Sequence, residues 1–237
     1  MMTLEKLVRD FLYEPHKFFK YKDLNGNAIY KEFAFDNYEH YLLEYLGFFK
    51  RINTLKDVVS YACCGVFEVT RDNQVFLIRH NHQEYFIGNN GSHRGLPLED
   101  GKSVVRVVHT RLSEIKAVDN FEKLYNIIKE CSETKLQFGQ LSIYDAAVRI
   151  GAFLGIKPDF VYIHTGVKAG VTVLEELGYT NEQLSNRYFA PLKEFPVEMH
   201  EMTEISAENF SCKSKDKFKM LPRKGWIDKL NEYPADL

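Results

Sequence analysis

The sequence lacks the features of secreted and membrane-spanning proteins. Its four cysteines include an adjacent pair, Cys63 and Cys64, and none has the CxxC spacing of a metal site, so no disulfide framework is predicted. No run of 18 uncharged apolar residues occurs, and the first ten residues contain four charged side chains where a signal peptide needs an apolar core. We therefore expect a cytoplasmic protein that does not cross a membrane.

Motifs of several large enzyme classes are missing as well. The sequence contains no GxxxxGK(S/T) phosphate-binding loop, no GxSxG and no HExxH. The spacing of His80 and His82 suits a metal ion, but no carboxylate or cysteine at ligand spacing completes the set. We therefore predict no metal ligand and no cofactor.

The composition that is present favours a folded and mainly helical chain. With 237 residues, of which 14% are aromatic, the protein is far from the profile of a disordered chain. Apolar residues recur at helical spacing in several segments. The predicted helices cover 3–13, 103–115, 119–131, 142–154 and 165–177, and two more begin after Asp36 and Thr54. Asn25-Gly26 and Asp72-Asn73 predict small β-hairpins within 18–33 and 66–79.

The domain organisation predicted from the sequence is simple. No internal repeat appears, and the prolines scattered after Gly178 predict an irregular segment there. We expect a single mainly helical domain over 1–210, with a helix-hairpin-helix-like core, followed by a basic tail over 211–237. Lysines of this tail, among them Lys215 and Lys217, suit a phosphate backbone, and the alternative is that they keep the protein soluble.

A glycine between two predicted helices is the first candidate for a binding site. Gly139, with Gln140 beside it, lies between the helices 119–131 and 142–154, where a glycine turn lets backbone N–H groups approach a phosphate. Gln137 stands where a helix-hairpin-helix element usually has its first glycine. An ordinary connection between two helices is the alternative interpretation.

Ionisable and phenolic residues are dense in the segment that follows. They are Tyr144, Asp145, Arg149, Asp159, Tyr162, His164 and Lys168. Asp145 and Arg149 are four residues apart on one helix face, so a structural ion pair is the alternative to a functional role. His164 precedes a helix start, where it suits a donor, an acceptor or a base, although a lone histidine is more often structural. Their density on short connections favours a functional site.

Residues 80–97 form a second candidate region. They show no periodic hydrophobic pattern and are predicted to be a loop rich in glycine, asparagine and histidine. His93 and Arg94 in this loop suit a phosphate or a protein partner. We expect these two side chains to contact nucleic acid.

The stretch from Gly139 to Gly170 resembles the signature of an uncharacterised bacterial family, a YDxALRIG core followed by VYLHAG. The matching residues are Tyr144, Asp145, Ala147, Arg149, Ile150, Gly151, Val161, Tyr162, His164 and Gly166. More distantly, the layout is similar to helix-hairpin-helix DNA glycosylases, in which a glycine hairpin precedes a PxD-type segment by about twenty residues. Pro158-Asp159 has this position, whereas Leu141 replaces the catalytic lysine of the bifunctional members.

The resemblance implies a monofunctional DNA glycosylase that hydrolyses the base–sugar bond with water, and its bacterial setting suggests phage defence. Asp145 or Asp159 would stabilise the oxocarbenium-like transition state, and His164 would face the reacting sugar. Tyr144 or Tyr162 would stack on an extruded base. The alternative is a non-catalytic DNA-binding or protein-interaction module that uses the same helix-turn-helix element and basic tail. In the first case, and in the DNA-binding form of the second, the expected partner is DNA.

Overall fold

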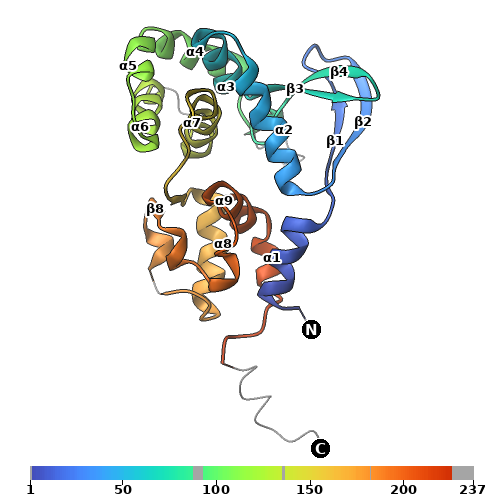
Figure 1. Ribbon diagram of the computed structural model, residues 1–237, viewed down its shortest axis with the longest axis vertical. Helices are drawn as coiled ribbons and strands as arrows, with labels where there is room; N and C mark the ends of the chain where they lie inside the picture. The colour runs from blue at the N-terminus through green and yellow to red at the C-terminus, as the bar shows by residue number, and fades with distance from the viewer. Residues whose placement is uncertain (1, 88–92, 135–136, 182, 226–237) are drawn as a thin grey trace, which may run out of the picture. The chain divides into compact units, whose positions relative to one another are not determined.

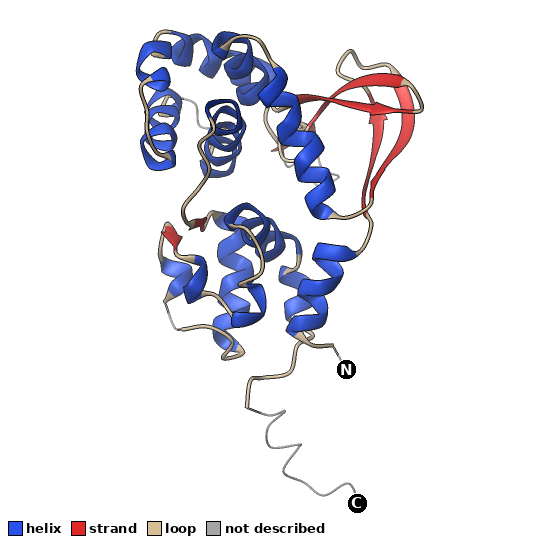
Figure 2. Ribbon diagram, viewed as in Figure 1, coloured by secondary structure: helices blue, strands red, loops and turns tan. Residues whose placement is uncertain are grey.

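The chain divides into two compact units, and its first helix belongs with its C-terminal third. The computed structural model describes residues 2–87, 93–134, 137–181 and 183–225. Unit 1 consists of Met1–Glu14 and Asp159–Leu237, and unit 2 is Pro15–Pro158. Both units consist mainly of helices, and each also contains at least one small antiparallel pair of strands (Figure 2). Among the described residues, no helix has the length and apolar character needed to cross a membrane.

Unit 2 is built around one central helix. Its helices are α2 (Tyr38–Arg51), α3 (Leu55–Cys64), α4 (Leu98–His109), α5 (Leu112–Lys116), α6 (Phe121–Ser132) and α7 (Gln140–Leu154). Helices α2, α3 and α6 all pack against α7, and Figure 1 shows α7 between α6 and the other two. Each residue of α7 from Ser142 to Gly151 is buried. The polar residues Ser142, Asp145 and Arg149 of α7 therefore lie inside the unit.

Three antiparallel pairs of strands complete the described part of unit 2. The sequence predicts the two larger pairs, whereas the third lies in the segment 80–97 that was predicted to be a loop. The pairs are β1 (His16–Lys22) with β2 (Ala28–Phe35), β3 (Val66–Arg71) with β4 (Gln74–Arg79), and the short β5 (Phe86–Ile87) with β6 (His93–Arg94). Asp72 and Asn73 have φ values of 51° and 59°, as a tight hairpin turn requires. The N–H of Leu24 donates to the carbonyl of Leu77 at 3.0 Å, so the two larger hairpins are joined.

Several helices begin at residues other than the predicted ones. The side chain of Asn37, not that of Asp36, accepts the capping hydrogen bond of α2. Helix α4 begins at Leu98 rather than Ser103, because Pro97 has the fixed φ that suits a helix start and Gly101 continues the helix. A Cβ at Gly101 would lie 3.1 Å from the carbonyl of Cys63, so glycine here allows α4 to pack closely on α3.

Unit 1 has its own apolar core. Its elements are α1 (Leu4–Tyr13), β7 (Val161–Tyr162) paired with β8 (Phe189–Ala190), α8 (Thr165–Glu176), α9 (Glu204–Lys213), α10 (Lys215–Phe218) and the 3₁₀ turns Leu184–Asn186, Leu192–Glu194 and Val197–Met199. Leu7 of α1, Val171 of α8, Phe210 of α9 and Phe218 of α10 share this core. The start and the end of the chain therefore fold together.

The two-unit organisation differs from the single domain over 1–210 and the tail over 211–237. Periodicity identifies helices one at a time, but it does not show which helices share a core. The irregular segment predicted after Gly178 contains helix α9, and the predicted tail contributes α10 and the buried Phe218 to unit 1. Helix α9 has no apolar stripe in its sequence, because it buries Ser206, Glu208 and Ser211. A hydrophobic pattern therefore does not reveal it.

Candidate functional site

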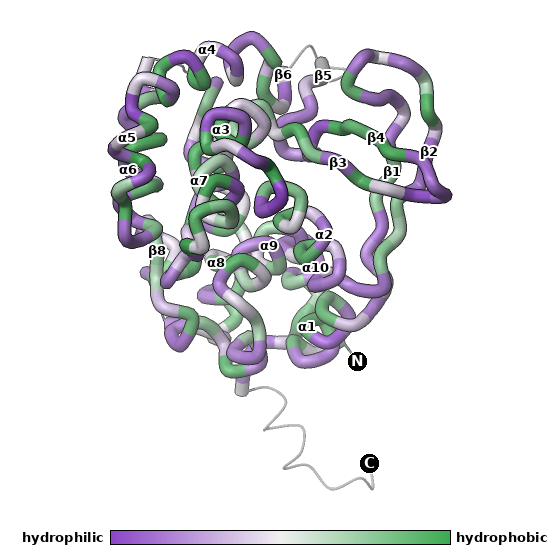
Figure 3. The backbone as a smooth tube through the Cα atoms, turned by 45° about the horizontal axis from the view of Figure 1, so that its top comes forward, coloured by the Kyte–Doolittle hydropathy of each residue, from purple (hydrophilic) through white to green (hydrophobic). Residues whose placement is uncertain are grey.

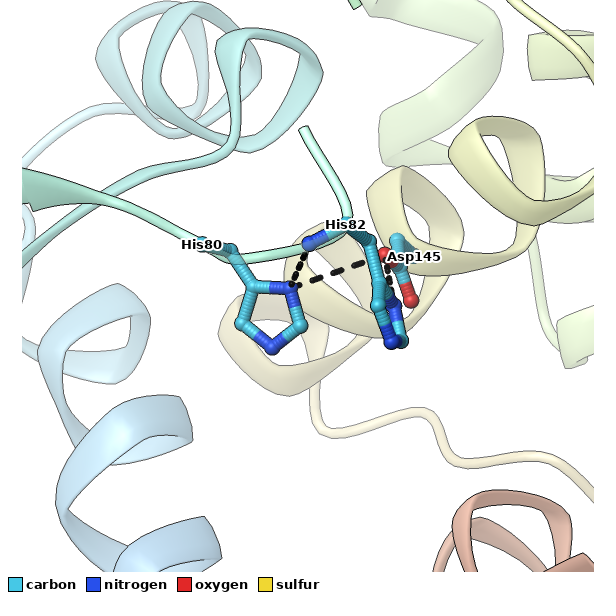
Figure 4. Close-up of side chains that lie close together, drawn as sticks. All are labelled: His80, His82 and Asp145. Atoms are coloured by element: carbon cyan, nitrogen blue, oxygen red, sulfur yellow. Dashed lines mark hydrogen bonds and ion pairs between the residues drawn. The ribbon is translucent and has the colours of Figure 1, made fainter. Parts of the chain in front are cut away.

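Three side chains that can bind protons or metal ions meet in unit 2. His80 and His82 lie in the connection after β4, and Asp145 lies on α7 (Figure 4). Nδ1 of His82 is 3.1 Å from Oδ2 of Asp145, and Nδ1 of His80 is 4.0 Å from the same oxygen. Ligand atoms of the three residues lie within 4.8 Å of one another. The fold thus supplies the carboxylate that the sequence spacing of the two histidines lacks.

Arg149 lies beneath this cluster and is only 1% exposed. Its guanidinium donates to the hydroxyl of Tyr45, to the carbonyl of Ala62 at 2.8 Å and to Oε1 of Gln83 at 2.6 Å. A further N–H lies 3.3 Å from Oδ2 of Asp145. These partners come from α2, α3 and the loop after β4, so Arg149 joins three parts of unit 2. Its predicted contact with nucleic acid is wrong, because the side chain is inside the unit.

The carboxylate of Asp145 is held from several sides. Nε2 of Gln83 donates to Oδ2 at 2.8 Å, beside the contacts of Arg149 and His82. Burial alone would raise the pKa of this carboxyl, but the positive charges of protonated His82 and Arg149 outweigh it, and the pKa is lowered well below its ordinary value. Asp145 is therefore ionised at neutral pH and acts as an acceptor.

A tight turn places the histidines and Gln83 over α7. The N–H of Gln83 donates to the carbonyl of His80 at 3.0 Å, and the N–H of His80 donates to the carbonyl of Gly65 at 2.7 Å. Gly65 ends α3 with φ at 68°, and a Cβ there would lie 2.7 Å from the side chain of Gln83. Glycine is required at this position so that Gln83 reaches Asp145. The ring of His80 stacks on Tyr45 with centroids 5.2 Å apart.

The hydrogen-bond pattern assigns different roles to the two histidines. The backbone N–H of His82 donates to Nδ1 of His80 at 3.3 Å, so a neutral His80 carries its proton on Nε2. The ionised Asp145 can only accept, so Nδ1 of His82 carries a proton. In a neutral His82 the lone pair is then on Nε2. The pair can therefore combine a proton acceptor with a neighbouring donor.

The three predicted catalytic residues do not form one site in either unit. Asp145 belongs to unit 2, whereas Asp159 and His164 belong to unit 1, where Asp159 is exposed before β7. Nδ1 of His164 accepts from the N–H of Gly166 at 3.3 Å and caps α8, and Nε2 contacts Glu208. His164 therefore has a structural role that its sequence position does not reveal.

The remaining candidates divide into buried and exposed residues. Tyr144 and Tyr162 are 2% and 6% exposed, so neither ring presents a face on which an extruded base can stack. The exposed candidates are Gly139, Gln140, Lys168, Arg94 and Lys217, whereas Lys215 is half-buried. The side chain of His93 lies outside the described residues. Sequence reasoning missed Gln83 and Tyr45, since neither has a motif that points to Asp145.

The predicted helix pair around Gly139 is present, but the glycine itself is not required by the backbone. Gly139 precedes α7 with φ at −77°, a value that any residue adopts, and a Cβ there would meet no atom within 4 Å. A helix-hairpin-helix glycine is needed for a close backbone approach. The conformation of Gly139 gives no such reason, so a helix-hairpin-helix core stays a prediction.

The signature from Gly139 to Gly170 is divided between the units. Its first part, with Asp145 and Arg149, forms the centre of unit 2, and its second part, with Tyr162 and His164, belongs to unit 1. The resemblance to the bacterial family and to DNA glycosylases stays a prediction. No family model, no curated protein and no solved structure matches the chain.

Proposed function

We propose that the protein hydrolyses the bond between a base and its sugar in DNA, with His82 as the general base. One observation supports this most directly: His82 Nδ1 lies 3.1 Å from Oδ2 of Asp145, whose position Arg149 and Gln83 hold. A histidine oriented by an ionised carboxylate is suited to proton transfer at neutral pH. Asp145 is a positioning residue in this scheme, because its own protein partners enclose it.

The reaction needs a proton acceptor for the attacking water and a hydrogen-bond donor to the departing base, and the two histidines supply both. Nε2 of His82 takes a proton from water, and the water oxygen bonds to the anomeric carbon of the sugar as the bond to the base breaks. Nε2–H of neutral His80 donates a hydrogen bond to the departing base, which leaves with the electron pair of the broken bond and takes its proton from solvent water. The products are a free base and an abasic sugar. Loss of the proton from His82 to solvent then returns the site to its starting form.

The choice of DNA as substrate is supported by the loop beside the site and by the resemblance of the signature. The N–H of Leu96 donates to the carbonyl of Gln83 at 3.3 Å, so the segment after β6 runs along the turn that carries His82. Arg94 in β6 is exposed and suits a phosphate. A phosphate contact at the exposed start of α7, near Gly139 and Gln140, and a role in phage defence belong to the same proposal.

Release of bases from plain and base-modified duplexes tests the proposal. After incubation with the protein, alkali breaks the DNA strand wherever a base has been lost. We expect breaks with the wild-type protein and a decrease of about 100-fold or more with His82→Gln. His40→Gln is a matched control, because His40 also contacts carboxylates, those of Asp36 and Glu44, but on the surface of the same unit.

A second control separates this site from the residues of unit 1. Asp159 is exposed in unit 1 and has no role in the proposed reaction, so Asp159→Asn should release bases at the wild-type rate. Full activity of His82→Gln would contradict the role of His82. Absence of breaks in every duplex with the wild-type protein would favour the non-catalytic binding module instead.

A metal ion is a second candidate for the same centre, and the clustering of the three side chains favours it. Two imidazoles and a carboxylate suit zinc, nickel or iron, and their ligand atoms lie within 4.8 Å of one another. The guanidinium of Arg149 opposes this candidate, because it lies 3.3 Å from Oδ2 of Asp145 and repels a further cation. Calorimetric titration with zinc separates the two. Saturable binding that His82→Gln abolishes and His40→Gln retains would assign a metal centre.

A further inference from the structure

Three aromatic side chains are exposed together on the outward face of the β1–β2 hairpin. Phe19, Tyr21 and Tyr30 are 44%, 65% and 69% exposed. The rings of Phe19 and Tyr21 meet edge to face with centroids 4.9 Å apart, and those of Tyr21 and Tyr30 are 6.2 Å apart. The three rings thus form one continuous aromatic face.

The opposite face of the hairpin already provides the packing that holds it to unit 2. Phe18 and Phe35 contact the ring of Tyr41 on α2, and Phe33 contacts Phe76 on β4. Both strands carry hydrophobic as well as hydrophilic residues (Figure 3). The alternation of a strand places Phe19 and Tyr21 on the side away from this packing. The outward rings therefore do not contribute to the packing that holds the hairpin in place.

The backbone of Tyr30 is in a strained conformation, and the packing of its side chain does not explain this strain. Its φ is 44°, in the left-handed region that glycine adopts easily and a bulky residue does not. The register of the hairpin is irregular at the same place, between Lys20 and Lys22. Strained residues of this kind are found preferentially at functional positions. A tyrosine that is strained and mostly exposed is better explained by a ligand than by the core.

The charges on the hairpin favour an anionic ligand. Lys20 pairs with Glu84, Lys31 pairs with Asp72, and Lys17 lies 3.2 Å from Glu32. Asp23 accepts from the turn residues Asn25 and Asn27. The two acidic residues of the hairpin, Asp23 and Glu32, therefore both have hydrogen-bond or ion-pair partners. Lys22, next to Tyr21, is exposed and has no ion-pair partner in the part of the chain that the structure describes.

We infer that this aromatic face binds single-stranded nucleic acid, with bases stacked on Phe19, Tyr21 and Tyr30 and a phosphate near Lys22. Aromatic platforms with an adjacent cation bind single strands in this way, because every base has a flat face. The inference rests on the proposed function for the class of ligand, and it adds where an unpaired strand is held. The rings need no sequence-specific hydrogen bonds, so binding should depend little on base sequence.

Fluorescence anisotropy with labelled oligonucleotides tests the inference. A single-stranded 20-mer of thymidines and a duplex of equal length serve as probes at low and moderate salt. We expect the wild-type protein to bind the single strand more tightly than the duplex. Tyr21→Ala should weaken single-strand binding about tenfold, and Tyr21→Trp should restore it, because loss of one stacking ring has an effect of this order.

Tyr30→Gly separates a binding role from a structural one. Glycine adopts the backbone conformation of Tyr30 without strain, so the melting temperature should not fall, yet single-strand binding should weaken. Tyr188→Ala is the matched control, since Tyr188 is 76% exposed in unit 1. Unchanged binding in the Tyr21→Ala and Tyr30→Gly double variant would overturn the inference and favour a protein partner for this face.

The outcomes also distinguish this inference from the proposed function. His82→Gln should lose base release while it keeps oligonucleotide binding, and the hairpin variants should lose binding of the single strand. The wild-type protein could release bases while the hairpin variants bind the single strand as tightly as the wild type does. That result would overturn the inference and leave the proposed function standing. Single-strand binding that needs the hairpin, without base release from any duplex, would support the inference and contradict the proposed function.

Discussion

Each unit contains a histidine in contact with a buried carboxylate, and the two pairs differ in what surrounds them. In unit 1 the side chains of His164 and Glu208 are 4% and 1% exposed, and both ring nitrogens of His164 hold the fold. In unit 2 the side chain of His82 is 19% exposed, and its contact with Asp145 uses Nδ1. The same residue types thus form a structural pair in one unit and a partly accessible pair in the other.

The difference shows that the role of a histidine depends on its burial and on what its ring contacts. Nδ1 of His164 caps α8 through Gly166, so the ring cannot turn without exposing the start of that helix. The orientation of His82 depends on a carboxylate that Arg149 and Gln83 hold in place. A positioned and partly exposed imidazole ring can transfer protons, whereas an enclosed ring stabilises the fold around it.

The largest effect on stability should come from Arg149→Met. This change leaves Asp145 buried without its countercharge and removes the donor to Tyr45, Ala62 and Gln83. We expect the free energy of unfolding of unit 2 to fall by about 3–5 kcal/mol, measured by urea denaturation. Arg187→Met is the control, because Arg187 pairs with Glu194 at the surface and should lose about 1 kcal/mol or less. Equal effects of both variants would contradict a structural role for Arg149.

His164→Ala should have the next largest effect, on unit 1. It removes the cap of α8 and leaves the carboxylate of Glu208 with Asn209, whose side chain donates to it at 2.7 Å. We expect a loss of about 3 kcal/mol in urea denaturation, because the hydrogen-bond donor to a buried carboxylate and a helix cap are lost together. The double variant with Glu208→Gln should recover part of this loss. A melting temperature that does not move would return His164 to the list of candidate catalytic residues.

The pH dependence of stability should identify Asp145 as an ionised group. Its folded-state pKa is lowered, because the charges of protonated His82 and Arg149 outweigh burial, so its contribution is full above its unfolded-state pKa and is lost as pH falls below it. Asp145 itself is ionised in the folded and in the unfolded chain at neutral pH, so its own titration adds no pH dependence there. Below about pH 4 the difference in unfolding free energy between wild type and Asp145→Asn should shrink by up to about 1.4 kcal/mol per pH unit. A difference that stays constant down to pH 3 would show that Asp145 is not ionised.

The smallest effect on stability should come from His82→Gln. The side chain is partly exposed, and the amide of glutamine can still donate to Oδ2 of Asp145. We expect a loss of about 1 kcal/mol or less in urea denaturation, although base release should fall about 100-fold or more. A loss as large as that of His164→Ala would show that both histidine–carboxylate pairs are structural.

Local sequence patterns anticipated many secondary elements but fewer of the contacts between them. The turns at Asn25-Gly26 and Asp72-Asn73 need backbone conformations that few residue types adopt, so both hairpins were predictable. An ion pair was one of the two interpretations that the Asp145 and Arg149 spacing allowed, because a helix brings residues four apart together, and the structure contains that pair. Nothing in that spacing indicates that the pair is buried or that Gln83 and Tyr45 complete it.

By itself, the sequence determined the mainly helical character of the chain, the two hairpins and the Asp145–Arg149 pair, because each depends on residues close together in the chain. The tertiary structure decided that His80 and His82 meet Asp145, and that the start and the end of the chain share one unit. These contacts join segments separated by 60 residues or more, as the His82 and Asp145 contact with its separation of 63 illustrates. Such contacts arise from the packing of helices around α7 and around the core of unit 1, and local periodicity carries no information on which surfaces pack together.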